Sequence, residues 1–216
     1  MIVSDLTTKM IEKFMAALIQ IEDFKNDKEY DKALRIIDAT LSDIFRLNLK
    51  SFNSLQDEYL LEIIKVKDIV DAERCTIISI LLEKEAEILE INGDVNKCHL
   101  VFTKALSLIL EAHAINNEPE LIKFYSQIPI LIEKINDYEF SETISLKLFK
   151  YYEDTNNFGK SEDIFYDLLQ SKNKETALVN LGISFYERLL EKDSEALEKG
   201  GLPREEVQAA LEQLQA

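Results

Sequence analysis

The residues best suited to metal or acid–base chemistry in this sequence are two histidines and two cysteines, His99, His113, Cys75 and Cys98. The histidines stand in one predicted helix, and neither pairs with a cysteine at a spacing such as Cys-x-x-Cys, which is typical of zinc sites. Adjacent side chains on a helix point in different directions, so Cys98 and His99 do not form a ligand pair. We therefore expect no metal ion and no other cofactor, and we interpret both cysteines as reduced core residues.

A short run, Gly159-Lys160-Ser161, is similar to the end of a phosphate-binding loop. The leading glycine of such a loop is missing, because Asp154 stands at its position. The run also connects two predicted helices, whereas a phosphate-binding loop follows a strand. We therefore expect no nucleotide site here, no catalytic residue elsewhere and no enzymatic activity.

Three glutamates form the most regular charge pattern in the chain. Glu83, Glu87 and Glu90 are spaced by four and three residues, which places their carboxylates along one face of a helix. Like charges at this spacing repel one another mildly, so a cationic partner would stabilise them. Two interpretations stay open: a groove for a basic or N-terminal segment of a partner, or an ordinary solvated helix face.

The composition narrows the fold and the class of partner. Forty-one Asp and Glu against 25 Lys and Arg give a formal charge of −16, which repels phosphate backbones and anionic lipids. We therefore expect neither nucleic acid nor a membrane as a partner. Five Gly, three Pro and no Trp favour long helices joined by short connections. Because the sequence shows neither a secretory signal nor an apolar run near the ~20 residues of a membrane span, we expect a cytoplasmic protein.

Helical periodicity covers almost the whole chain and predicts one all-α domain over residues 1–216. Breaks are expected at residues 48–53 and 199–203, and Pro129 should kink or divide the helix around it. The predicted helices cover residues 5–25, 28–47, 54–66, 71–91, 94–115, 141–154, 158–171 and 174–192, with a further helix opening at 118–120.

Residues 202–216 are expected to form a terminal amphipathic helix, with Val207, Leu211 and Leu214 on its apolar face. This face could cap the last repeat, as the terminal elements of solenoids do. The alternative is self-association, in which the helix swaps onto a neighbouring protomer across a hinge at Gly200 and Gly201.

Three short connections share one pattern of residue types. Each has a polar turn, an aromatic or apolar residue, a small residue three positions later and an apolar residue four positions beyond that. A small residue lets the second helix approach the first closely, so each connection predicts an antiparallel helix hairpin. The three positions hold Tyr30, Val95 and Phe158, then Ala33, Cys98 and Ser161, then Ile37, Phe102 and Phe165.

On these residues the chain resembles the tetratricopeptide repeat, whose helix pairs use a similar turn, small residue and aromatic residue. The resemblance implies a right-handed solenoid of antiparallel helix hairpins. The small residues stand 65 and 63 positions apart, close to twice the ~34 of the standard repeat, so additional helices are expected between the hairpins. Residues 48–61 and the segment Leu148-Phe149-Lys150-Tyr151-Tyr152-Glu153 are also similar to an uncharacterised tetratricopeptide-like family, a domain of unknown function, of low-GC Gram-positive bacteria.

In a tetratricopeptide solenoid, the first helices of the pairs line a concave surface that binds peptides or helices. We therefore expect a non-catalytic scaffold for a protein or peptide, with a basic partner as one candidate. The alternatives are a peptide-sensing regulatory domain and an enzyme of unrecognised type. Carried over position by position, the resemblance places Glu22, Glu83, Glu87, Glu90, Lys150 and Glu153 on the concave surface.

Overall fold

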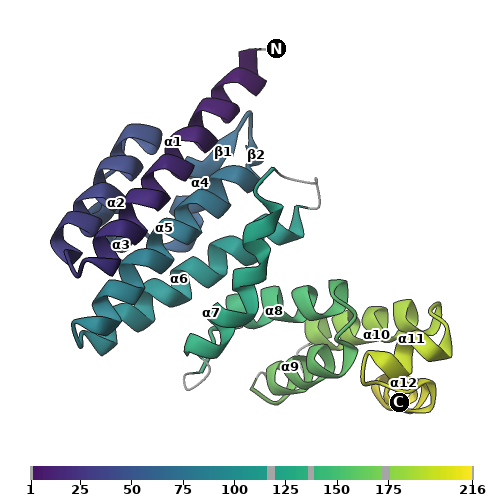
Figure 1. Ribbon diagram of the computed structural model, residues 1–216. Coiled ribbons are helices and arrows are strands. Elements are labelled where there is room, and N and C mark those ends of the chain that lie inside the picture. The colour runs from purple at the N-terminus through teal and green to yellow at the C-terminus, as the bar shows by residue number, and fades with distance from the viewer. Residues whose placement is uncertain (1, 116–119, 136–138, 172–175, 216) are drawn as a thin grey trace. The chain divides into compact units, whose positions relative to one another are not determined.

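The computed structural model describes residues 2–115, 120–135, 139–171 and 176–215. The chain divides into two compact units, Met1–Tyr138 and Glu139–Ala216 (Figure 1). Within the described residues almost everything is helical, and two strands of two residues each are the whole of the sheet. The expected all-α class is therefore confirmed, whereas the single domain over 1–216 stays a prediction.

The first unit is built on two long helix hairpins. Helix α1 packs on α2, α5 packs on α6, and α5 also contacts both α1 and α2. Helix α7 packs on α6, which places a further helix beside the second hairpin. The elements are α1 (Ile2–Asn26), α2 (Tyr30–Phe45), α3 (Leu49–Ser54), α4 (Asp57–Ile64), β1 (Lys65–Val66), β2 (Ile69–Val70), α5 (Ala72–Ile91), α6 (Val95–Ala114), the 3₁₀ helix η1 (Ile122–Gln127) and α7 (Ile128–Ile135).

The second unit contains the third hairpin and the C-terminal helices. Helix α8 packs on α9, and α12 packs on α10. The core between them is aromatic, and Phe165 and Phe185 are fully buried in it. The elements are α8 (Glu142–Asp154), α9 (Phe158–Ser171), α10 (Thr176–Leu190), α11 (Ser194–Lys199) and α12 (Arg204–Gln215).

The three connections with a common sequence pattern also have a common backbone geometry. Lys28, Gly93 and Asn156 adopt positive φ angles of 60°, 78° and 57° at equivalent positions. The residue after each donates its N–H to a carbonyl that the preceding helix leaves unpaired. These bonds run from Glu29 to Phe24 (2.8 Å), from Asp94 to Leu89 (3.0 Å) and from Asn157 to Tyr152 (2.8 Å). The predicted equivalence of the three turns is therefore confirmed at the level of the backbone.

The small residues of the pattern lie where the helices of each hairpin meet. Ala33 and Ser161 are fully buried and Cys98 is nearly so. The Ser161 hydroxyl donates to the carbonyl of Phe149 on the facing helix at 2.9 Å. A larger side chain at these positions would separate the paired helices, which explains why the pattern requires small residues.

Helix α3 spans Leu49–Ser54, so the break predicted at residues 48–53 is wrong except at Asn48, which precedes the helix. The Asn48 side chain caps α3 by accepting from the Ser51 N–H at 2.9 Å. At the other end, the Lys104 ammonium of α6 donates to the carbonyls of Phe52, Asn53 and Leu55 at 2.7 to 3.0 Å. A side chain about fifty residues away thus completes a helix of one and a half turns.

The predicted helix over 54–66 is also shorter than expected. It spans Asp57–Ile64 as α4 and is followed by the β1–β2 hairpin, in which Val66 pairs with Ile69. Lys67 and Asp68 at the hairpin tip both have positive φ, as a two-residue primed turn requires. Pro129 divides its segment as expected, because η1 ends at Gln127 and the proline lies in the first turn of α7.

The C-terminal helix is packed within its own unit. Val207 and Ala210 of α12 are buried in the second unit's core, and Leu211 and Leu214 pack against that core. This packing agrees with the capping interpretation, while self-association through α12 stays a prediction.

The glycine pair proposed as a hinge is a close packing contact. The Gly159 N–H donates to the Gly200 carbonyl at 3.0 Å. A Cβ on Gly159 would lie 2.8 Å from the Gly201 carbonyl oxygen, and one on Gly200 would lie 2.2 Å from the Phe158 ring. Gly159, part of the run that is similar to a phosphate-binding loop, is thus required for packing.

Within the described residues, the helices are too short or too polar to cross a bilayer.

Candidate functional site

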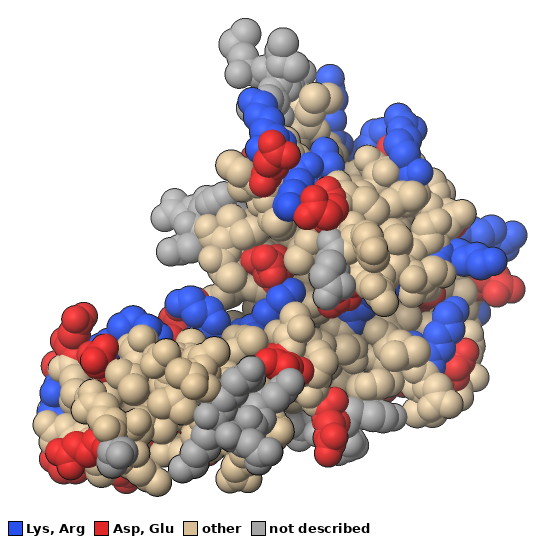
Figure 2. All heavy atoms as spheres, turned by 180° about the vertical axis from the view of Figure 1, so that it is seen from behind, with Lys and Arg blue, Asp and Glu red and all other residues tan. Residues whose placement is uncertain are grey.

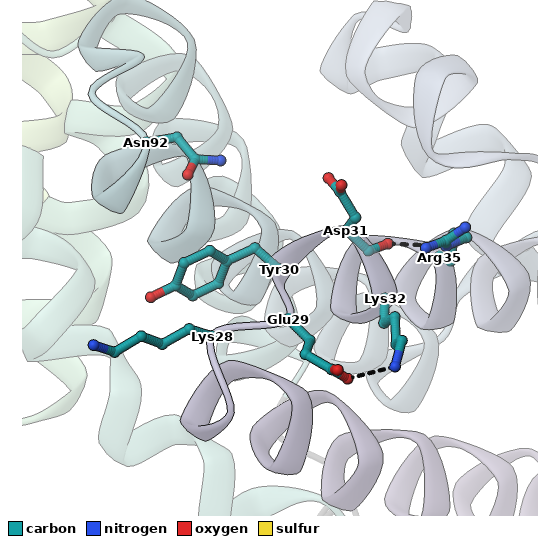
Figure 3. Close-up of a pocket in the computed structure, with 7 residues that line it drawn as sticks. All are labelled: Lys28, Glu29, Tyr30, Asp31, Lys32, Arg35 and Asn92. Carbon is teal, nitrogen blue, oxygen red and sulfur yellow. Dashed lines mark hydrogen bonds and ion pairs between the residues drawn. The ribbon is translucent and has the colours of Figure 1, made fainter.

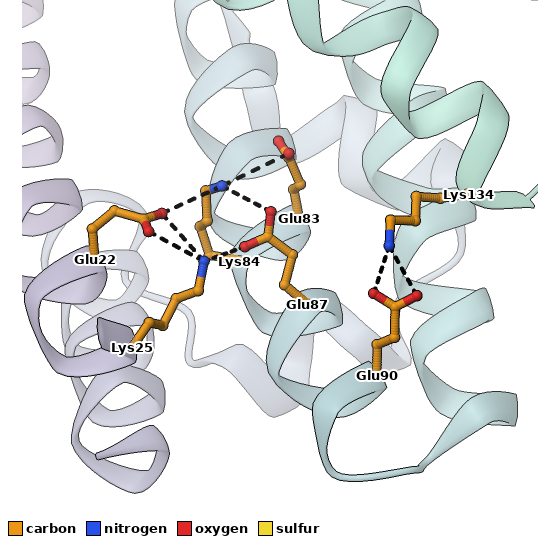
Figure 4. A network of polar contacts seen from close by, with 7 residues as sticks. All are labelled: Glu22, Lys25, Glu83, Lys84, Glu87, Glu90 and Lys134. Carbon is orange, nitrogen blue, oxygen red and sulfur yellow. Dashed lines mark hydrogen bonds and ion pairs between the residues drawn. The ribbon is translucent and has the colours of Figure 1, made fainter. Parts of the chain in front are cut away.

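The six predicted concave-surface residues fall into two sets. Glu22 lies on α1 and Glu83, Glu87 and Glu90 lie on α5, all in the first unit, whereas Lys150 and Glu153 lie on α8 in the second unit. The structure brings Glu22, Glu83 and Glu87 together with two lysines. We call this group, Glu22, Lys25, Glu83, Lys84 and Glu87, the α1–α5 charge network (Figure 4).

Two ammonium groups hold the network together. The Lys84 Nζ lies 2.9 Å from Glu87 Oε1, 3.4 Å from Glu22 Oε1 and 3.8 Å from Glu83 Oε1. Lys25 Nζ lies 3.3 Å from Glu22 and forms a second ion pair with Glu87. Lysines of the same chain thus partly neutralise these carboxylates, which the sequence alone left without cationic partners.

Within the α1–α5 charge network, the pKa of the Glu83 carboxyl is shifted most. Its residue is only 3 % exposed, and Oε2 has no hydrogen-bond partner among the described residues. Burial raises the pKa of the Glu83 carboxyl to about 7, against the attraction of Lys84 and Lys25 and with the repulsion of Glu87 and Glu22. Near neutral pH the Glu83 carboxyl is therefore partly protonated and partly ionised.

Glu87 shows the opposite outcome in the same network. Burial alone would raise the pKa of its carboxyl, but Lys84 and Lys25 lower it below its ordinary value. The two lysines therefore favour the charged form of Glu87 and leave Glu83 incompletely compensated.

Glu90 lies outside the network and has its own cation. The Lys134 ammonium of α7 donates to both carboxylate oxygens of Glu90, at 2.9 and 2.7 Å. The same ammonium lies 5.8 Å from the centre of the Phe102 ring, within cation–π distance. Helix α7 therefore covers the end of the glutamate stripe with a positive charge.

In the second unit the two predicted residues have different surroundings. Lys150 is exposed and pairs with Asp154 one turn further along α8, at 2.6 Å. Glu153 is buried and accepts two hydrogen bonds from Arg188 of α10, from Nε at 2.7 Å and from Nη2 at 2.9 Å. This bidentate pair connects α8 to α10 and satisfies the Glu153 carboxylate within the unit.

A pocket of about 440 Å³ lies at the turn end of the first unit (Figure 3). Within it, Lys32 pairs with Glu29 at 2.7 Å, while Lys28 has no ion pair with any described residue. The pocket offers both positive and negative groups, and the Tyr30 ring and the Asn92 amide also line it. It is lined by Lys28, Glu29, Tyr30, Asp31, Lys32, Arg35 and Asn92.

Opposite charges are interspersed rather than gathered into one acidic surface on the face shown in Figure 2. Within the described ranges, no three His, Cys, Asp or Glu side chains are grouped as metal ligands would be. Cys75 and Cys98 are both buried, and they form no disulfide bond.

A family model, described as a family of unknown function (DUF6483), matches residues 1–216. The chain belongs to DUF6483. No curated protein and no solved structure matches it. The match confirms an uncharacterised family, whereas the tetratricopeptide resemblance and the bacterial range stay predictions.

Two features of this DUF6483 chain were not predicted from its sequence. The pocket at the turn end contains none of the six predicted residues, although the aligned turns at Lys28 and Gly93 were a signal that the hairpin ends are equivalent. The lysines of the charge network were also missed as partners. Lys25 and Glu87 are 62 residues apart, so their pairing depends on how α1 packs against α5.

Proposed function

We propose that this chain is a non-catalytic protein- or peptide-binding module of the tetratricopeptide-like kind, and that its first unit is the binding unit. The three equivalent turns and the buried small residues support the repeat architecture. A solenoid of this kind has no chemistry of its own and acts by presenting an extended surface to a partner.

The observation that carries the proposal is the distribution of exposed apolar side chains. In the described part of the chain, every large apolar side chain that is strongly exposed belongs to the first unit. Burying such side chains against a partner is favourable at about 25 cal/mol per Å². They are Leu6, Ile19, Tyr59, Ile69, Ile91, Val95, Leu100, Ile122 and Ile130, from 47 to 68 % exposed.

The α5–α6 turn combines apolar and polar groups on one surface. Ile91 and Val95 flank this turn and are 55 and 58 % exposed, while Asn92 between them lines the pocket next to Tyr30. Interfaces typically combine an apolar centre with polar groups around it. We therefore propose this turn as part of the binding surface.

Site-specific photo-crosslinking in cells that express the protein tests this proposal. A photoreactive amino acid placed at Val95 should capture a defined protein, whereas the same amino acid at the exposed Gln208 of α12 should not. The captured protein is then purified, and its binding to the native chain is compared with binding to an Ile91→Ser, Val95→Ser variant by calorimetry. Loss of binding in the variant, with an unchanged unfolding transition, supports the module.

Identical crosslinks from Val95 and Gln208, or equal affinity of the native and variant chains, would contradict the proposal for this surface. The peptide-sensing domain and the enzyme of unrecognised type stay as alternatives. Glu83 has the shifted pKa that an enzyme would need, but its carboxylate lies buried in a charge network between two helices.

A further inference from the structure

The α1–α5 charge network is one positive charge short. It contains the carboxylates of Glu22, Glu83 and Glu87 but only the two ammonium groups of Lys25 and Lys84. The charged groups that act on Glu83 are these four neighbours, two from α1 and two from α5. With all five groups ionised, the network carries a net charge of −1 in a largely buried position, which is unfavourable.

The geometry shows where the deficit is located. Lys84 Nζ lies within hydrogen-bond distance of Glu87, at 2.9 Å, but 3.8 Å from Glu83, beyond the range of a good hydrogen bond. The Glu83 Oε2 atom is buried and lacks a hydrogen bond to any described residue. Lys84 is shared among three carboxylates, and the Glu83 carboxylate is the one farthest from its ammonium group.

The network is open to solvent on the side of Glu22 and Glu87. The Glu22 and Glu87 side chains are 46 and 25 % exposed, against 4 % for Glu83. A cationic group from outside can therefore contact these two partly exposed carboxylates without entering the buried part of the network, which holds Glu83.

We propose that the Glu22 and Glu87 carboxylates bind one lysine or arginine side chain of a partner protein or peptide, and that Lys84 then moves fully onto Glu83. The incoming cation supplies the third positive charge. Lys84 is released from Glu22 and Glu87 and closes the 3.8 Å gap to Glu83 Oε1, so that all three carboxylates are neutralised. This inference rests on the proposed binding function and names the chemistry that the first unit would recognise.

The mechanism has a distinctive consequence, which is that binding and deprotonation of Glu83 are coupled. Glu83 has a pKa of about 7 in the free protein, and full pairing with Lys84 returns that pKa toward its ordinary range. By linkage, a cation that lowers the pKa of Glu83 must bind more tightly when Glu83 is already ionised. The affinity should therefore rise about five- to tenfold between pH 6 and pH 8.

The test is a titration of the full chain with acetyl-Gly-Lys-Gly-amide, a neutral-ended peptide with one ammonium group. The carboxyl ¹³C shift of Glu83 is followed against pH by NMR at constant moderate salt, with and without the peptide. We expect the peptide to lower the midpoint of the Glu83 titration by at least about one pH unit, because Lys84 then pairs fully with the Glu83 carboxylate. Acetyl-Gly-norleucine-Gly-amide, which lacks the charge, should leave the midpoint unchanged.

Variants separate this site from general attraction to an acidic protein. Glu22→Gln should abolish the peptide-induced shift, and Glu83→Gln should remove the pH dependence of peptide affinity. Glu195→Gln, which removes an exposed carboxylate paired with Lys199 in the second unit, should change neither. An unmoved Glu83 midpoint, an equal effect of the norleucine peptide, or an unaltered shift in Glu22→Gln would overturn the inference. These results would leave the crosslinking test of the α5–α6 turn unaffected.

Discussion

Replacing Glu83 by Gln should stabilise the protein at pH 8 and have little effect at pH 5. The pKa of Glu83 is about 7 in the folded chain and near 4.5 when the chain is unfolded. Between these values the folded chain holds a proton that the unfolded chain has released, so this residue makes the free energy of unfolding fall as pH rises. Above pH 7 the folded chain also loses the proton, and no further stability is lost.

The size of the effect follows from the same two pKa values. The difference between the folded and unfolded pKa values corresponds to roughly 3 kcal/mol of unfolding free energy, of which about 2 to 3 kcal/mol is lost between pH 5 and pH 8. Gln is neutral and close in shape, so it removes this pH dependence. The stability of the variant relative to the native chain should therefore increase by about 2 to 3 kcal/mol over this pH range.

Amide hydrogen exchange in α5 is the appropriate measurement, because the chain has two compact units and the slowest amides of α5 report on the first. Exchange is measured for the native chain and for Glu83→Gln at pH 5, 6, 7 and 8, after correction for the intrinsic exchange rate. Glu195→Gln, an exposed change in the other unit, serves as the control. If the difference between native and Glu83→Gln chains is constant with pH, the raised pKa of Glu83 is refuted.

Three further predictions concern side chains that connect elements. Lys104→Met should lower the stability of the first unit by about 2 to 4 kcal/mol, measured by thermal unfolding, because three carbonyls lose a charged donor; a shift no larger than for an exposed lysine would contradict it. In a double-mutant cycle of Arg188→Met and Glu153→Gln, the coupling energy should be about 1 to 3 kcal/mol, since Arg188→Met alone leaves a buried carboxylate unpaired; additive effects would show that the pair is not coupled. Gly200→Ala should destabilise the second unit by about 1 to 3 kcal/mol in urea unfolding, because its Cβ would overlap the Phe158 ring; an unchanged midpoint would mean that the junction relaxes freely.

The parts of the fold that were predictable are those set by local sequence. The hairpin turns follow from residues within one turn of each other, such as Gly93, which adopts the positive φ that ends α5. The predicted helices 71–91 and 141–154 also begin at the right places, because the Asp71 and Ser141 side chains cap α5 and α8 by accepting from N–H groups of the first turn. These signals depend on neighbouring residues only, so no knowledge of the tertiary structure was needed.

The short elements were missed because distant residues stabilise them. Helix α3 has six residues, too few to be stable alone, and it depends on Lys104 of α6 for its C-terminal carbonyls. Helix α11 is equally short, and its one buried residue, Leu197, lies in the aromatic core of the second unit. Periodicity over six residues cannot distinguish such a helix from a loop, since the deciding contacts are not in the window.

The glutamate stripe shows what the helical spacing could and could not predict. The i, i+4, i+7 pattern predicts the face of α5 on which Glu83, Glu87 and Glu90 lie, but it does not predict how deeply each side chain is buried. Both interpretations of the stripe, a binding groove and a solvated face, took all three carboxylates to be exposed. In the structure the side-chain exposure rises from 4 to 25 to 47 % along the stripe.

One signal in the sequence could have predicted the burial of Glu83. The run Cys75-Thr76-Ile77-Ile78-Ser79-Ile80-Leu81-Leu82 has apolar residues on every side of the helix, and all eight residues are buried. A helix that is apolar all round is packed on all sides, so the next residue, Glu83, also starts inside the protein. A buried carboxylate must be protonated or paired. The single nearby cation on the helix, Lys84, cannot fully neutralise both Glu83 and Glu87. The sequence of α5 alone therefore implies a carboxyl with a raised pKa and a need for a cation from another helix, which Lys25 of α1 supplies in part.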